Sequence, residues 1–174
     1  MDEKTITIFG TAKAKPGDSA YVTAHEIGKI LAQAGFTIAN GGYGGTMLAA
    51  AKGAAQAGGK TIGVTCSAFK RSTANEYINR EIVTNSLDER LDTLIKLGSA
   101  FVVLPGGTGT LLELAKVWEL KNKGFLEEGK PIILVSRFWN MLVDLIATDD
   151  PESIRCIHIA AGPNEVKDIL VNGI

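Results

Sequence analysis

The chain alternates short runs of β-branched and other apolar residues with longer segments of helical periodicity, and this pattern continues from end to end. Such alternation is typical of strands joined by crossover helices. The predicted strands span residues 5–9, 36–39, 61–65, 81–84, 101–104, 132–135 and 156–159. The predicted helices span residues 19–34, 47–56, 138–147 and 163–171, and two more begin at Ser86 and after the stretch 105–110. Seven strands with intervening helices predict a three-layer, doubly wound α/β fold with a mainly parallel sheet.

Length and helix pattern agree with one domain. A chain of 174 residues suits a single core, so we expect one domain over residues 1–174. The predicted helix 19–34 has an apolar stripe made of Val22, Ile27, Ile30, Leu31 and Ala34. The helix that opens at Ser86 has a second stripe, made of Leu87, Leu91, Leu94 and Ile95. Ser86 with Glu89 also forms a capping-box pattern at that helix start.

Composition excludes several classes of function. The 18 Lys and Arg residues nearly balance the 19 Asp and Glu residues, so the chain lacks the basic surplus of a protein that binds a nucleic-acid polymer. No apolar run approaches the ~20 residues of a membrane span, and no signal pattern opens the chain. We therefore expect a cytoplasmic protein that does not associate with a membrane.

Metal and thiol chemistry are disfavoured by the scarcity of histidine and cysteine. Cys66 and Cys156 lie 90 positions apart without a zinc-like cluster, and we expect two reduced, buried thiols, although a disulfide would also be possible. His25 and His158 lack the neighbours of a catalytic triad and are interpreted as packed or surface residues. The sequence thus predicts no metal site.

Two glycine clusters follow predicted strands and precede predicted helices. One is Gly41, Gly42, Gly44 and Gly45, and the other is the stretch 105–110, which reads PGGTGT. Both must lie at the carboxyl edge of a parallel sheet, where helix N-termini and flexible glycine backbone suit a phosphate. The chain has neither the GxxxxGK loop of nucleoside triphosphatases nor the GxGxxG dinucleotide fingerprint. Tight turns alone would be the other explanation of these glycines.

Glu113 and Arg90 allow two interpretations. Thr110 through Glu113 reads TxxE, so Glu113 could close a capping box, and Arg90 could be a solvated helix charge. Alternatively, Glu113 lies one turn beyond the phosphate loop, and Arg90 opens a helix at the same sheet edge. A carboxylate and a guanidinium beside a bound phosphate would suit chemistry on the attached sugar.

The segment from Leu104 to Glu113 matches the PGGxGTxxE signature of the LONELY GUY (LOG) family of nucleoside 5′-monophosphate phosphoribohydrolases, which are often labelled lysine decarboxylases. Four more segments resemble that family: residues 9–11 its first loop, 41–47 its GGGxxGLM segment, 53–63 its GA…GG…GV pattern, and 86–90 its MHERK segment. The resemblance covers most of residues 5–135.

This resemblance implies a Rossmann-like homodimer or higher homo-oligomer that needs no cofactor and splits a purine or cytokinin-like nucleoside 5′-monophosphate into free base and ribose 5-phosphate. Arg90 and Glu113 match the family's catalytic pair, with Arg90 expected to hold Glu113 ionised. The residues that match its phosphate and nucleotide site are Gly10, Thr11, Gly42, Gly44, Gly45, Met47, Gly106, Gly107, Thr108, Gly109 and Thr110.

The chain departs from the family pattern in three places. Asp88 and Leu91 replace the His and Lys of the MHERK segment, Leu112 replaces a common Glu, and the second glycine loop is one residue shorter. These departures admit a binding protein, either a nucleotide sensor or a relative of the molybdenum cofactor carriers, which bind a phosphorylated pterin. The polar stretch 66–80, with Lys70 and Arg71, is predicted to form a lid that selects the ligand.

Overall fold

The computed structural model describes residues 4–70, 73–127 and 129–174. Within these residues the strands are β1 (Thr5–Phe9), β2 (Thr37–Asn40), β3 (Thr61–Cys66), β4 (Arg80–Thr84), β5 (Ala100–Val103), β6 (Ile132–Val135) and β7 (Ile157–Ala160). The helices are α1 (Ser19–Gln33), α2 (Thr46–Gln56), α3 (Leu87–Leu97), α4 (Thr108–Asn122), α5 (Asn140–Ala147) and α6 (Pro163–Gly173), and a 3-10 turn, Ser153–Cys156, precedes β7. The predicted α/β fold is confirmed.

All the strands of the described chain pair in parallel, in the order β4-β3-β2-β1-β5-β6-β7. The chain therefore winds outward from β1 in one direction and resumes at β5 on the other side of β1. The loops after β1 and β5 diverge at this change of direction. In a doubly wound sheet, that divergence opens a crevice at the carboxyl ends of the strands.

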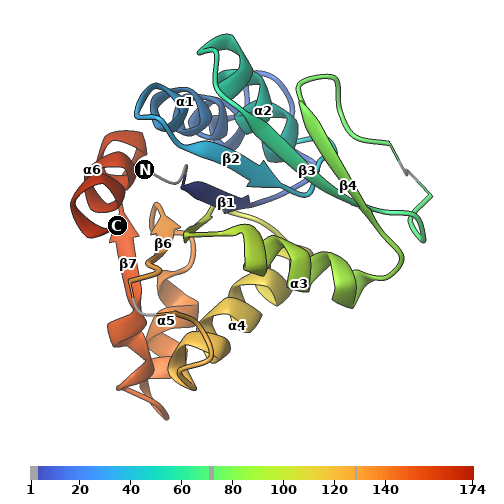
Figure 1. The fold of residues 1–174 in the computed structure, drawn as a ribbon. Helices are drawn as coiled ribbons and strands as arrows, with labels where there is room; N and C mark the ends of the chain where they lie inside the picture. Colours follow the sequence, from blue (N-terminus) through green and yellow to red (C-terminus); the bar gives the residue numbers. More distant parts are fainter. Residues whose placement is uncertain (1–3, 71–72, 128) are drawn as a thin grey trace.

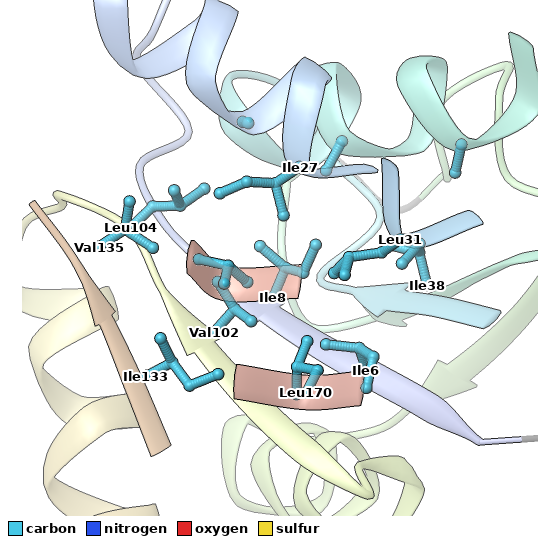
Figure 2. Packing of buried hydrophobic residues seen from close by; sticks show 14 of the residues in the cluster. Ile6, Ile8, Ile27, Leu31, Ile38, Val102, Leu104, Ile133, Val135 and Leu170 are labelled. Carbon is cyan, nitrogen blue, oxygen red and sulfur yellow. The ribbon is translucent and has the colours of Figure 1, made fainter. Parts of the chain in front are cut away.

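Two helical layers cover the sheet, with α1, α2 and α6 on one face and α3, α4 and α5 on the other (Figure 1). A hydrophobic core lies on each face of the sheet, and successive residues of the central strands point into one core or the other. Ile6 and Ile8 point to the first face, and Phe9 points to the second. Figure 2 shows Ile6 and Ile8 packed in one cluster with Ile27 and Leu31 of α1. This alternation explains why the central strands have apolar residues on both faces.

Several expectations of detail are wrong. Val22 and Leu87, placed on buried stripes, are 56% and 42% exposed, and Ala34 is exposed at the end of α1. The helix predicted from residue 138 begins at Asn140. Both cysteines are free, but Cys156 is only partly buried. Helical periodicity sets an apolar face with an uncertainty of about one residue at either margin, which explains the misplaced stripe residues.

The start of α3 is capped as its sequence predicts. The Ser86 hydroxyl accepts a hydrogen bond from the Glu89 amide (3.1 Å), and the Glu89 carboxylate accepts one from the Asn85 amide (2.8 Å). This reciprocal arrangement fixes the first turn of α3, which carries Arg90.

Helices α1 and α2 approach each other through paired glycines. A Cβ atom at Gly28 would overlap the carbonyl oxygen of Ala50, and one at Gly53 would overlap the carbonyl oxygen of His25. Because backbone atoms, rather than flexible side-chain ends, occupy this space, the two helices can pack this closely only with glycine at both positions.

We expect Gly28→Ala to lower the free energy of unfolding by about 1–3 kcal/mol, because the added methyl group forces the helices apart. Gly173→Ala is the matched control, since a Cβ at this helical position has open space around it. Denaturant unfolding of the two variants measures the effect. Equal stability of Gly28→Ala and the wild type would contradict the close approach.

Candidate active site

A cavity of about 790 Å³ lies at the carboxyl edge of the sheet, where the loops after β1, β2 and β5 meet the first turns of α3 and α4. This is the crevice expected from the change of winding direction between β1 and β5. Its volume is in the range of small-molecule sites, which is about 300–1,000 Å³.

Ten of the thirteen residues predicted for the site line this cavity. They are Gly10, Thr11, Gly44, Met47, Arg90, Gly107, Thr108, Gly109, Thr110 and Glu113. The other three, Gly42, Gly45 and Gly106, are not among the residues that line it, and the packing around them points to roles in shaping the loops.

The PGGTGT loop leads directly into α4, whose N-cap is Gly107. The amides of the first helical turn have no acceptor within the helix, and this turn carries no acidic residue. A Cβ at Gly107 or Gly109 would meet nothing within 4 Å, so the outer surface of the loop is open toward the cavity. On its inner side, a Cβ at Gly106 would overlap the Thr110 hydroxyl, so Gly106 allows the loop to pack on α4.

The loop after β2 is held in place by a side chain that sequence reasoning missed. Asn40 accepts a hydrogen bond from the Gly42 amide (2.8 Å) and donates one to the Met47 carbonyl (3.0 Å), so its amide bridges the glycine cluster. Gly42 has a φ of 77° and Gly45 a φ of 64°, conformations that favour glycine. Asn at the end of a strand, just before a glycine cluster, was the available signal.

Hydrogen bonds join the loop after β1 to the loop after β2. The Thr46 amide and hydroxyl both donate to the Thr11 carbonyl, at 2.9 and 3.0 Å. A Cβ at Gly45 would overlap the Thr11 carbonyl oxygen, so this contact needs glycine there. Thr11 and Gly44 are thereby brought to the same cavity, as the sequence predicts for segments far apart along the chain.

Arg90 is buried beneath the cavity with only 6% of its surface exposed. Its Nε donates to the Val64 carbonyl of β3 (2.8 Å), and a Cβ at Gly41 would overlap its Nη2. The interpretation of Arg90 as a solvated charge is therefore wrong. A buried guanidinium requires a polar partner, and the cavity supplies one.

That partner is Glu113, whose Oε1 lies 3.7 Å from Arg90 Nη1. The capping interpretation of Glu113 is wrong, because α4 begins two residues before Thr110 and its N-cap is Gly107. Burial raises the pKa of Glu113 from 4.5 to about 7, while the charge of Arg90 acts in the opposite direction. The expectation that Arg90 holds Glu113 ionised is thus corrected: burial raises the pKa of this carboxyl more than the charge of Arg90 lowers it, so the carboxyl can hold or release a proton near neutral pH.

Further lining residues were not predicted as site residues. Lys13 lies in the loop after β1, and Tyr43 lies within the glycine cluster that follows β2. Phe69 lines the cavity from the stretch 66–80 that was predicted to cover the site, whereas Lys70 is not among the lining residues and Arg71 lies outside the described residues.

An apolar wall completes the cavity. It is made of Leu87 together with Leu91 and Leu112, which are two of the positions where the chain departs from the family pattern. These two departures therefore lie at the site itself and make one side of it less polar.

No group of three or more His, Cys, Asp or Glu side chains in residues 4–70, 73–127 and 129–174 could hold a metal ion. Over the same residues, no helix has the length and apolar character needed to cross a bilayer.

Known proteins resemble this chain in sequence and in fold. Over 134 residues it is 37% identical to the cytokinin riboside 5′-monophosphate phosphoribohydrolase of Mycobacterium tuberculosis, and the match covers 75% of this chain and 70% of that protein. Across the curated relatives that match this chain, the matched region covers 57% to 70% of the relative's own length.

Solved structures match over almost the whole chain. The molybdenum cofactor binding protein of Rippkaea orientalis is 25% identical with a TM-score of 0.82, and the match covers 99% of this chain and 98% of that one. The molybdenum cofactor carrier protein of Chlamydomonas reinhardtii is 28% identical with a TM-score of 0.77, covering 98% and 97%.

These matches confirm the LOG-like resemblance predicted from residues 104–113. The family model described as the SLOG cluster4 family matches residues 3–166, and the chain therefore belongs to that family.

Proposed function

We propose that this protein hydrolyses the N-glycosidic bond of a nucleoside 5′-monophosphate with a purine or cytokinin-like base, releasing the free base and ribose 5-phosphate. The observation that carries the proposal is the buried Arg90–Glu113 pair in a cavity that also contains the open N-terminus of α4. An anion site and a carboxyl of raised pKa thus share one small cavity.

The phosphate would bind at the first turn of α4. The free amides of this turn, the partial positive charge of the helix end and the hydroxyls of Thr108 and Thr110 are suitable donors for a phosphate dianion. The ribose and base would lie against the loops after β1 and β2, which line the cavity with Gly10, Thr11, Gly44 and Met47. The remaining predicted residues, Gly42, Gly45 and Gly106, act indirectly in this proposal, by shaping those loops.

Glu113 would act on the ribose. Loss of the base leaves positive charge on the sugar, and a carboxylate stabilises that charge and accepts a proton from the attacking water. The water oxygen then bonds to C1′, the C1′–N bond breaks with its electron pair going to the base, and the proton that Glu113 accepted from water passes to the departing base, which restores the carboxylate. Arg90, fixed on the Val64 carbonyl, would orient the Glu113 carboxylate and contact the substrate's oxygens.

A second function has support of its own. Two of the solved structures that match over nearly the full chain are molybdenum cofactor binding and carrier proteins, so a protein that binds a phosphorylated ligand without cleaving it is the alternative. Incubation with AMP and other monophosphates, with assay of free base and ribose 5-phosphate, separates the two. If no monophosphate is cleaved while molybdopterin or a nucleotide raises the melting temperature, binding alone is the function.

Glu113→Gln is expected to reduce kcat for the best monophosphate by at least about 10²-fold, because the proton acceptor and the negative charge are both removed. Binding should persist, since the α4 N-terminus is unchanged. Glu119→Gln is the matched control: Glu119 lies on the same helix, but its side chain is 62% exposed and pairs with Lys123. Unchanged turnover in Glu113→Gln would reject the catalytic role.

The pH dependence of hydrolysis should follow the Glu113 carboxyl. Its pKa is about 7 and its ionised form is the reactive one, so kcat/KM should rise as pH increases toward 7 and level off above it. Binding of the monophosphate to Glu113→Gln over the same range reports the titration of the phosphate itself, whose second pKa is about 6. A rate that falls as pH increases from 6 to 8 would show that the protonated carboxyl is the reactive form.

We also propose that the protein forms a homodimer, as the family resemblance implies, and that it acts in the cytoplasm, which suits its two free cysteines. Exposed apolar side chains on α5 support self-association, since Met141 is 85% and Leu145 is 64% exposed. Sedimentation velocity at micromolar concentration should give a dimer, and a monomer throughout the range would contradict this assignment.

A further inference from the structure

Two aromatic rings lie beside the buried guanidinium of Arg90. Its Cζ atom is 5.5 Å from the centre of the Tyr43 ring and 5.7 Å from the centre of the Phe69 ring. The two rings are 6.0 Å apart and inclined at 42°. Both distances from Arg90 are within the range at which a guanidinium is attracted to a π face, which is about 6 Å.

The two rings differ in how firmly the protein holds them. The Tyr43 hydroxyl accepts a hydrogen bond from the Cys66 amide (2.8 Å), and the Tyr43 carbonyl accepts one from the Asn75 side chain (2.8 Å). Phe69 lies in a turn after β3, where its amide donates to the Cys66 carbonyl (3.1 Å), and its side chain is 37% exposed. Hydrogen bonds therefore hold Tyr43 in place, whereas the Phe69 ring is the more exposed of the two and is the one that can be substituted with less disturbance.

The direct hydrogen bond of Arg90 holds one edge of its guanidinium, and Nη2 packs against Gly41. Nε is fixed on the Val64 carbonyl, but Nη1 lies 3.7 Å from Glu113 Oε1, which is longer than a direct hydrogen bond. Because no direct hydrogen bond fixes this ion pair, the position of the guanidinium relative to Glu113 depends on the groups that pack against its two faces. Among the described residues, Tyr43 and Phe69 provide that restraint on the cavity side.

We propose that Tyr43 and Phe69 are positioning residues that clamp the Arg90 guanidinium beside Glu113. The proposal rests on the proposed function in one respect, that Arg90 and Glu113 are the reacting pair. In this arrangement the segment after β3 has a specific role, because Phe69 completes the electrostatic environment of the carboxyl through Arg90. Neither aromatic residue is among the motif residues that predicted the site.

The clamp has a measurable consequence for the Glu113 carboxyl. The charged or titratable side chains that share its cavity in the described chain are Arg90 from α3, Lys13 from the loop after β1, and Tyr43. The four other charged side chains of α3, those of Asp88, Glu89, Asp92 and Lys96, are exposed, and Asp92 pairs with Lys116 of α4 at 2.6 Å. Arg90 is the group that lowers the pKa of Glu113, so a less restrained guanidinium should let that pKa rise.

The clamp is tested by a pH titration of the Glu113 side-chain carboxyl carbon, followed by NMR in the unliganded protein. Phe69→Leu keeps apolar volume but removes the π face, and it should move the titration midpoint upward by about half a pH unit or more. Phe69→Tyr keeps the π face and should retain the wild-type midpoint. Phe125→Leu is the matched control, because Phe125 is 76% exposed and is not among the residues that line the cavity.

An unchanged midpoint in Phe69→Leu would overturn the clamp, and so would equal upward shifts in Phe69→Leu and Phe69→Tyr. Melting temperatures of the variants confirm that each is folded at the pH values used. Because the titration requires no turnover, it decides the clamp independently of nucleotide hydrolysis. A protein that shows the expected shift but cleaves no monophosphate would retain the clamp and lose the proposed function.

Discussion

The reversal of winding direction between β1 and β5 is the constraint on which the rest of the molecule depends. Because these two strands are neighbours in the sheet but lead in opposite directions, their following loops separate and leave space above the strand ends. The glycine cluster after β2 borders the same space, and the Thr46–Thr11 hydrogen bonds tie it to the first loop. The cavity is thus a result of strand order, and the side chains decide what it can bind.

Within this cavity, burial and charge act in opposite directions on one carboxyl. Removing Glu113 from water favours its neutral form, and the nearby Arg90 favours its charged form; burial has the larger effect, so the pKa is raised to about 7. Arg90 is itself buried and needs compensation, which the Val64 carbonyl, the Glu113 carboxylate and two aromatic rings provide. A buried ion pair contributes little net stability, so its presence here agrees with a functional role.

Much of the fold and part of the site could be predicted from local sequence. The alternation of apolar runs with helical periods predicts the α/β architecture, and PGGTGT before a helix predicts the open N-terminus of α4. The neighbours of Arg90 could not be predicted in this way. Val64 and Phe69 come from β3 and the turn after it, whereas Tyr43 comes from the loop after β2, and only the tertiary packing around α3 brings them to Arg90. The direction of the pKa shift at Glu113 depends on three-dimensional burial, which spacing along the chain does not encode.

Phosphorus NMR of the wild-type protein with AMP tests the central claim most directly, because one spectrum distinguishes the intact nucleotide, ribose 5-phosphate and inorganic phosphate. We expect the AMP signal to be replaced by that of ribose 5-phosphate, with no inorganic phosphate released, and Glu113→Gln to leave the AMP signal in place. Release of inorganic phosphate would show that the protein cleaves the 5′-phosphate ester, which would contradict cleavage at the glycosidic bond. Persistence of AMP and of the other monophosphates with wild-type protein would contradict hydrolysis at the glycosidic bond.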